Sequence, residues 1–212
     1  MRFTNRDEAA RLLAEQLLRF KAQQPLILGV PRGGVPMAKI IAERLGCQFD
    51  VVLVRKLRTP EQPELAMGAI DEAGHVYAYG RKAAVSLELY AEEVAVQVAE
   101  IRRRRHLYSA KRPAIPATGH TAIIVDDGIA TGASMVAALR AVRAQRPLRI
   151  VVAVPVAARD SLDLATSYAD EVVCLYTPRV FFAVGDFYDD FSAVADSTVV
   201  EMLDGRAAQS GL

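Results

Sequence analysis

Residues 122–134, Ala-Ile-Ile-Val-Asp-Asp-Gly-Ile-Ala-Thr-Gly-Ala-Ser, specify the architecture of this chain. Their apolar start predicts a buried strand, and the residues after the turn have a helical pattern. Backbone N–H groups of such a turn point outward at the helix N-terminus, where they can bind a phosphate group. Gly128 and Gly132 let the backbone approach an anion closely, and Thr131 and Ser134 add hydroxyl donors. We therefore expect a strand–turn–helix unit that binds a phosphate monoester.

The acids Asp126 and Asp127 need a separate explanation, because carboxylates repel phosphate. Ionised carboxylates only accept hydrogen bonds, so ribose hydroxyls are suitable partners. A sugar with a 5′-phosphate would fit both halves of the segment. The alternative is that the two acids merely end the strand and cap the helix. Neither GxxxxGK[ST] nor GxGxxG occurs in the segment, which argues against a Walker A loop and a dinucleotide fingerprint.

The strand, the run Asp-Asp-Gly-Ile-Ala-Thr-Gly-Ala-Ser and the helix resemble the phosphoribosyl pyrophosphate (PRPP) signature of type I phosphoribosyltransferases. The resemblance implies that Asp126 and Asp127 contact the ribose hydroxyls, with Asp127 also counted as catalytic. It implies that the turn binds the 5′-phosphate through Gly128, Ile129, Ala130, Thr131, Gly132, Ala133 and Ser134.

Two further segments are similar to the family's pyrophosphate-facing elements. One is a Gly-rich turn after a predicted strand at residues 26–30, and in the family it often contains a non-proline cis peptide. Its implied substrate-binding residues are Pro31, Arg32, Gly33 and Gly34. The other is Val-Arg-Lys at the end of a predicted strand over residues 50–54, as in adenine and orotate members, and it implies catalytic roles for Arg55 and Lys56. The alternatives are a simple strand–helix turn and solvated cations at a strand end.

Residues 181–189, Phe-Phe-Ala-Val-Gly-Asp-Phe-Tyr-Asp, resemble the base-binding segment of hypoxanthine-guanine members. Carried over, Phe182 stacks on the base, Val184 contacts it, and Asp189 helps to bind magnesium, the one cofactor that the family implies. Aromatic clusters also form ordinary cores, which is the alternative here. The chain departs from these members at Ala130, where they have an Asp that exchanges a proton with the base. The acceptor base is therefore left open.

Strand and helix patterns alternate along the chain, which favours parallel strands and right-handed crossovers. Helices are predicted at residues 5–22, 36–45, 86–110, 131–145 and 160–168, and the remaining strands at 121–125, 149–154 and 171–176. We expect an α/β fold, a doubly wound and mainly parallel sheet, as one domain over residues 1–212. Residues 56–81 are punctuated by Pro and Gly and predict a flexible hairpin that closes as a lid, with short strands at 66–70 and 75–79. Residues from about 177 to 212 form the expected hood and tail.

The composition excludes several other classes of protein. The net charge of +1 gives no field that attracts nucleic acid or membranes. Four consecutive arginines, residues 102–105, could contact nucleic acid, but cations also suit a helix C-terminus. Cys47 and Cys174 have no metal-ligand spacing. One disulfide between them is the alternative, but two distant cysteines are more typical of reduced, buried thiols in a cytoplasmic protein. The charged N-terminus does not resemble a signal peptide, and no apolar run is long enough to span a membrane.

The leading functional hypothesis is a magnesium-dependent transfer of the phosphoribosyl group from PRPP to a nitrogen nucleophile, such as a nucleobase, with release of pyrophosphate. The expected partners are PRPP and a small-molecule base, without membrane or nucleic acid, and a homodimer is compatible with the resemblance. The second hypothesis is a non-catalytic sensor that binds PRPP or a nucleotide and regulates a partner. A third, weaker one is a hydrolase of pyrophosphate or phosphate esters on the same fold.

Overall fold

The computed structural model describes residues 1–59, 62–78, 86–109 and 113–205. In chain order its elements are α1 (Arg6–Leu17), η1 (Leu18–Gln23), β1 (Leu26–Gly29), α2 (Gly34–Leu45), β2 (Phe49–Val51), β3 (Val54–Thr59), β4 (Gln62–Asp71), β5 (Val76–Ala78), α3 (Leu87–Tyr108), β6 (Thr121–Val125), α4 (Ala133–Ala144), β7 (Arg149–Val156), α5 (Arg159–Thr166), β8 (Glu171–Tyr176), η2 (Val184–Phe187) and α6 (Asp196–Asp204).

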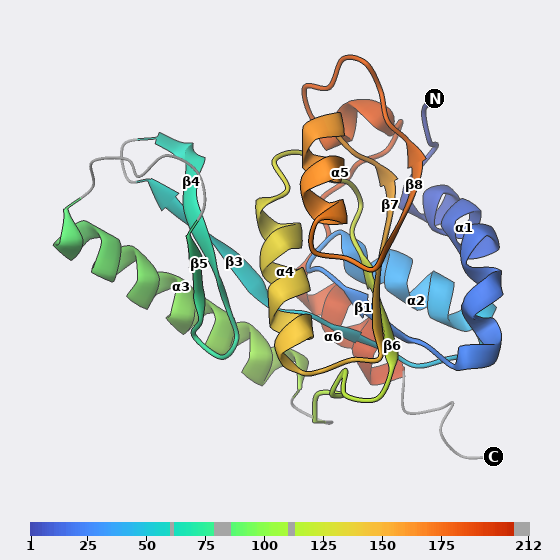
Figure 1. Cartoon of the computed structure of the whole chain (residues 1–212), viewed down its shortest axis with the longest axis horizontal. Helices are drawn as coiled ribbons and strands as arrows, with labels where there is room; N and C mark the ends of the chain where they lie inside the picture. The colour runs from blue at the N-terminus through green and yellow to red at the C-terminus, as the bar shows by residue number, and fades with distance from the viewer. Residues whose placement is uncertain (60–61, 79–85, 110–112, 206–212) are drawn as a thin grey trace.

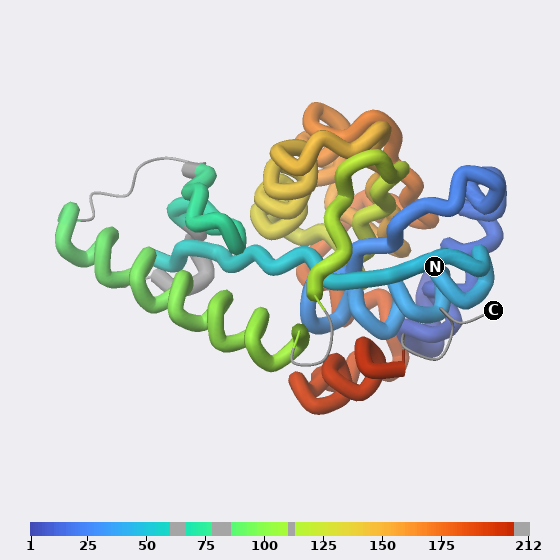
Figure 2. The backbone as a smooth tube through the Cα atoms, turned by 90° about the horizontal axis from the view of Figure 1, so that it is seen from below, coloured from blue at the N-terminus to red at the C-terminus, as the bar shows by residue number. Residues whose placement is uncertain are grey.

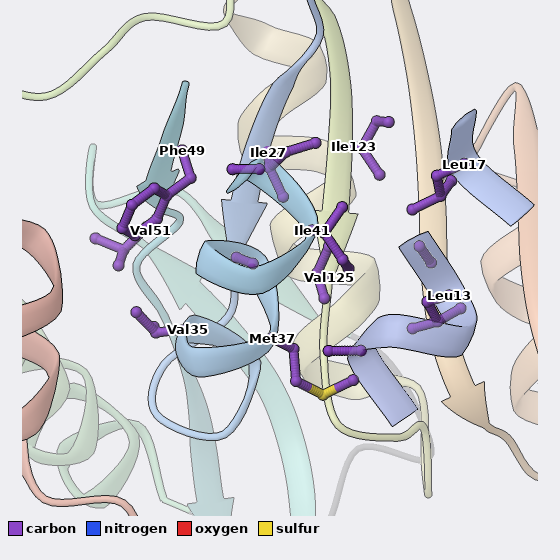
Figure 3. Close-up of a cluster of buried hydrophobic side chains, with 14 of the residues drawn as sticks. Leu13, Leu17, Ile27, Val35, Met37, Ile41, Phe49, Val51, Ile123 and Val125 are labelled. Atoms are coloured by element: carbon purple, nitrogen blue, oxygen red, sulfur yellow. The ribbon is translucent and has the colours of Figure 1, made fainter. Parts of the chain in front are cut away.

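A five-stranded parallel sheet with the order β2-β1-β6-β7-β8 forms the centre of the molecule (Figure 1). Successive residues of a strand face opposite sides, so each strand supplies both faces of the sheet. Ile27 and Ile123 pack with α1 and α2 on one face (Figure 3), and Val151 belongs to the same cluster. Leu28, Ile124 and Val152 pack with α4 on the other face. The predicted doubly wound, parallel sheet is confirmed.

The strand order reverses at β1, and this reversal positions the site. β1 pairs with β2 on one side and with β6 on the other, and the helices that follow β1 and β6 cover opposite faces. In open α/β sheets such a switch point leaves a crevice beyond the carboxyl ends of the strands, where ligands bind. The loop after β1 and the turn after β6 therefore lie next to each other, and Val30 donates its N–H to the Val125 carbonyl at 2.9 Å.

The structure differs from the prediction of one strand over residues 50–54 followed by a loose hairpin. β2 ends at Val51, and Val54 begins β3 of a separate antiparallel sheet with the order β3-β4-β5. The physical reason is the alternating pattern of β3, which buries Leu57 against the core while its neighbours face out. Figure 2 shows this sheet and α3 extending together from the body of the molecule.

The helix α3 begins and ends nearly where the sequence pattern predicts. Ser86 caps it, because its hydroxyl accepts the Leu89 N–H at 3.3 Å. Within the arginine run, Arg103 bonds to Glu100 and to Asp196 of α6, and Arg105 pairs with Glu72. These arginines therefore fasten α3 to its surroundings. Among the described residues, no helix is long and apolar enough to cross a membrane.

Candidate functional site at the sheet switch point

The turn between β6 and α4 is held by hydrogen bonds to the neighbouring strand and helix. Ile129 donates its N–H to the Val156 carbonyl at 2.9 Å and accepts the Ala158 N–H at 2.9 Å. The Ser161 hydroxyl donates to the Ala130 carbonyl at 2.6 Å. Gly132 has a φ of 77°, in the left-handed region that favours glycine, so α4 starts at Ala133 rather than at residue 131. The backbone curls here as a phosphate-binding turn requires.

A cavity of about 160 Å³ lies over this turn. It is lined by the whole predicted turn together with a cation, an acid and two apolar residues: Gly128, Ile129, Ala130, Thr131, Gly132, Ala133 and Ser134, with Lys56, Asp126, Met135 and Val184. The positive end of the α4 dipole and the Lys56 ammonium favour an anion in this cavity. Residues predicted from three separate segments thus meet at one place.

The two acids after β6 have different partners. Asp126 lines the cavity, and one of its carboxylate oxygens accepts the Asp127 N–H at 2.9 Å. The Asp127 carboxylate instead accepts a hydrogen bond from Arg6 Nε at 2.9 Å and forms an ion pair with Nη2 at 2.8 Å. Its backbone carbonyl accepts the Tyr188 hydroxyl at 2.7 Å. Only Asp126 therefore faces the space where a ligand would lie.

Burial raises the pKa of Asp126 well above the usual range of an aspartate. The neighbouring charge of Asp127 raises it further, whereas Arg6 and Lys56 oppose the shift. Burial also raises the pKa of Asp127, and there the Arg6 guanidinium is the main opposing influence. The site holds two adjacent acids in a poorly solvated place, so it favours a cation or hydroxyl donors near them.

The loop after β1 lies directly against the acid pair. Its Pro31–Arg32 peptide bond is cis, as the resemblance implies. A Cβ added at Gly33 would lie 1.8 Å from Asp127 Oδ2, and one added at Gly34 would lie 2.3 Å from the Val125 carbonyl oxygen. The glycines are therefore needed because this loop contacts the end of β6 without room for side chains. The Arg32 side chain in this loop is exposed to solvent.

Arg55 and Lys56 point in different directions because they are neighbours on β3. Lys56 lines the cavity, whereas Arg55 donates from Nε to Gln97 Oε1 of α3 at 2.9 Å. Burial lowers the pKa of Arg55, and the nearby Arg104 lowers it further. Arg55 is not among the described residues that line the cavity, so its role at pyrophosphate stays a prediction.

Of the three residues predicted to bind ligand or metal in the C-terminal segment, only Val184 lines the cavity. A Cβ at Gly128 would lie 2.6 Å from Val184 Cγ1. Phe182 is 86% exposed, whereas the neighbouring Phe181 packs on Phe187 with ring centroids 5.3 Å apart. Asp189 pairs with Arg2 at 2.8 Å, with its side chain 60% exposed. Base stacking by Phe182 and metal binding by Asp189 stay predictions.

Arg6 of α1 contacts the acid pair, and no sequence motif predicts this contact. Its partner Asp127 lies 121 residues further along the chain. One arginine among several charges of an N-terminal helix carries no signal of such a contact. In the part of the chain that the structure describes, no group of three or more His, Cys, Asp or Glu side chains could hold a metal ion.

The switch-point turn, its cavity and the parallel sheet define the class of a type I phosphoribosyltransferase. Residues 4–192 match the family model described as the phosphoribosyl transferase domain, and the chain belongs to this family. The Thermus thermophilus protein TT1426 has a similar structure, with a TM-score of 0.82 and 43% identity over 96% of this chain and 98% of that one.

Two curated relatives add further comparisons. A Mycobacterium tuberculosis H37Rv protein, named as a candidate phosphoribosyl transferase, is 43% identical over 205 residues, which are 95% of this chain and 46% of that protein. The chain thus spans about half the length of that relative. The transcriptional regulator GfcR of Archaeoglobus fulgidus is 33% identical over 60 residues, which are 28% of this chain and 30% of that protein.

Proposed function

We propose that this protein transfers the 5-phosphoribosyl group of PRPP to a nitrogen nucleophile, with release of pyrophosphate, and that the acceptor is a nucleobase. The observation that carries the proposal is the cavity at the switch point, which joins Lys56 and Asp126 to the N-terminal turn of α4. Membership of the phosphoribosyl transferase domain family supports the same reaction.

In the proposed complex, the turn from Gly128 to Ser134 binds the 5′-phosphate with its backbone N–H groups. Asp126 accepts hydrogen bonds from ribose hydroxyls, and its ionised carboxylate accepts them best. The loop with Arg32 and Gly33 lies on the other side of the acid pair and receives the pyrophosphate. Lys56 adds a positive charge at the cavity. The bond from C1 of the ribose to the pyrophosphate oxygen breaks, and the acceptor nitrogen gives its electron pair to C1.

The residues of the site fit a magnesium ion that PRPP brings with it. Mg²⁺ prefers few protein carboxylates plus substrate phosphates and waters, and Asp126 is the one acid among the described residues that line the cavity. Bound to pyrophosphate oxygens, the ion would neutralise part of the charge on the leaving group. Asp189 remains the protein ligand that the family resemblance implies.

The acceptor has to lose its proton without help from the turn, because Ala130 has no titratable side chain. A base that is already anionic or acidic, or one whose proton passes to water, meets this condition. Val184 provides an apolar contact beside Gly128 where a base could lie.

The experiment is a screen of purine and pyrimidine bases with PRPP and Mg²⁺ that measures pyrophosphate release. We expect release that depends on one base and disappears in Asp126→Asn. If PRPP binds but no base supports release, the transferase proposal is wrong.

A non-catalytic regulatory protein is the second candidate. It is favoured by the segment similar to the regulator GfcR and by the lack of a titratable residue at position 130. Such a protein would bind PRPP without turnover, and its ligand would alter binding to a partner. The base screen therefore separates the two candidates.

A further inference from the structure

We propose that Arg6 is a positioning residue for the ribose site: it holds Asp127 and thereby couples the acid pair to the C-terminal segment that carries Val184. This inference rests on the proposed function, because it assigns a role within the PRPP site. Arg6 acts through Asp127 and does not itself line the cavity.

The Arg6 guanidinium has three partners in three directions. Nε donates to Asp127 Oδ2 at 2.9 Å, Nη2 forms an ion pair with the same oxygen at 2.8 Å, and Nη1 donates to the Ser192 carbonyl at 2.8 Å. Its Cζ lies 3.9 Å from the centroid of the Phe191 ring, a cation–π contact. The side chains of Arg6 and Asp127 are only 12% and 15% exposed, so solvent screens this pair weakly.

Phe191, which contacts Arg6, is linked through Tyr188 to the backbone of Asp127. Phe191 stacks on Tyr188 with ring centroids 5.0 Å apart, and the Tyr188 hydroxyl donates to the Asp127 carbonyl at 2.7 Å. Both the side chain and the backbone of Asp127 are therefore fixed by the same group of residues. Since Asp126 is the preceding residue, its position depends on these contacts of Asp127 as well.

The loop after β1 rests on the same pair. A Cβ at Gly33 would lie 1.8 Å from Asp127 Oδ2 and 3.2 Å from Arg6 Nε. A movement of the Asp127 carboxylate would therefore disturb the proposed pyrophosphate loop directly. The planar guanidinium can satisfy a carboxylate and a carbonyl at once, which a lysine ammonium cannot do with the same geometry.

The positive charge of Arg6 also reduces the electrostatic repulsion between the carboxylates of Asp126 and Asp127. Without it, two neighbouring buried carboxylates would repel each other, and one would take up a proton or turn away. A protonated or displaced acid is a poorer acceptor for ribose hydroxyls. The backbone turn over Gly132 and Ser134 has its own supports, from Val156 and Ser161, and does not depend on Arg6.

The test compares Arg6→Ala with wild type by calorimetry, using ribose 5-phosphate and inorganic phosphate as separate probes. We expect the affinity for ribose 5-phosphate to fall about tenfold to a hundredfold, the size of a typical coupling between sites. The affinity for inorganic phosphate should stay unchanged. Arg6→Lys should lie between wild type and Arg6→Ala, and free guanidinium ion should restore part of the loss in Arg6→Ala.

Arg44→Ala is the matched control, because Arg44 forms an ion pair with Glu15 of α1 at 2.9 Å, with both side chains about half exposed. It should bind both probes as wild type does. Unchanged binding of ribose 5-phosphate by Arg6→Ala would overturn the inference, and so would an equal loss for both probes. If Arg6→Ala does not fold, Arg6→Lys and Arg6→Gln make the same comparison. Wild type that binds neither probe nor PRPP with Mg²⁺ would instead overturn the proposed function.

Discussion

Asp126 and Asp127 are adjacent in sequence and are both acidic, yet their environments differ. Asp126 faces the cavity with Lys56 nearby, whereas Asp127 is paired with Arg6. A site that keeps a buried acid for a ligand reduces the stability of the ligand-free protein, because the charged form is poorly solvated. This conflict between stability and binding can be measured.

We expect Asp126→Asn to stabilise the ligand-free protein at neutral pH. Burial raises the pKa of Asp126, so between the ordinary pKa of an aspartate and the raised pKa the folded state binds more protons than the unfolded state. The stability linked to this proton is complete below the ordinary pKa and is lost as pH rises through the folded pKa. Urea unfolding over a pH series measures the difference between wild type and variant.

The difference should grow from about pH 4 upward and then level off. Asp127 is coupled to Asp126, so the curve describes the pair rather than one group. A difference that does not depend on pH would show that the carboxyl of Asp126 is not perturbed by its surroundings.

We expect Gly33→Ala to abolish binding of PRPP. Its Cβ would lie 1.8 Å from Asp127 Oδ2, so either the loop or the carboxylate has to move, and both belong to the proposed site. Gly205→Ala is the control, since its Cβ would meet nothing within 4 Å. Calorimetry with PRPP and Mg²⁺ measures the effect. Wild-type affinity in a folded Gly33→Ala variant would contradict the close contact.

The segment predicted to be a flexible lid forms the antiparallel sheet β3-β4-β5, and this sheet and α3 contribute side chains to the core. Leu57 and Ile70 from this sheet and Ile101 from α3 belong to the main hydrophobic cluster. Deleting residues 57–76 would therefore remove part of the core and could not test a lid alone. That residues 56–81 close over a bound substrate stays a prediction, which hydrogen exchange with and without ligand can test. Of these, residues 60–61 and 79–81 lie outside the described part of the chain.

We expect Lys56→Ala to lower the rate of pyrophosphate release by about a hundredfold or more, the usual effect of losing one preorganised group at a developing charge. Ribose 5-phosphate should also bind more weakly, because Lys56 lines the cavity over the turn proposed to bind its phosphate. Arg58→Ala is the control, since Arg58 is an exposed cation on the same strand and is not among the described residues that line the cavity. Single-turnover rates measure the effect. Equal rates for Lys56→Ala and Arg58→Ala would remove Lys56 from the reaction.

At the scale of the whole molecule, the distribution of charge distinguishes the proposed transferase from a nucleic-acid-binding regulator. The formal net charge is +1, and members of the arginine run are bonded to Glu72, Glu100 and Asp196. Cations that already have acidic partners contribute little to the release of counterions from nucleic acid. The arginine run of α3 is therefore better explained by its contacts within the fold.

We expect the protein not to bind DNA or RNA at physiological ionic strength. Filter binding at several salt concentrations, with and without PRPP, measures it. Tight binding with a steep salt dependence would favour the regulatory candidate. Arg102→Ala tests the result further, because Arg102 is an exposed member of the run and its loss should then weaken the binding.

The local features of the site could be predicted from the sequence because they depend on short contiguous segments. A strand that ends in two acids, a turn with Gly128 and Gly132, and a helix that follows are properties of residues 122–145 alone. The alternation of apolar strands and amphipathic helices likewise predicts a doubly wound sheet, whereas the strand order and its switch point came from the structure.

Tertiary contacts alone assigned different partners to the two acids and to the two cations. Arg6 meets Asp127 across 121 residues, and Arg55 bonds to Gln97 of α3 while the adjacent Lys56 faces the cavity. No local pattern specifies such pairs, because hydrogen bonds form between whichever groups the packing of distant elements brings together. β3 and β4 are consecutive strands of a hairpin, but the side of β3 that faces the core is determined by burial of Leu57 in the main hydrophobic cluster, which includes distant elements.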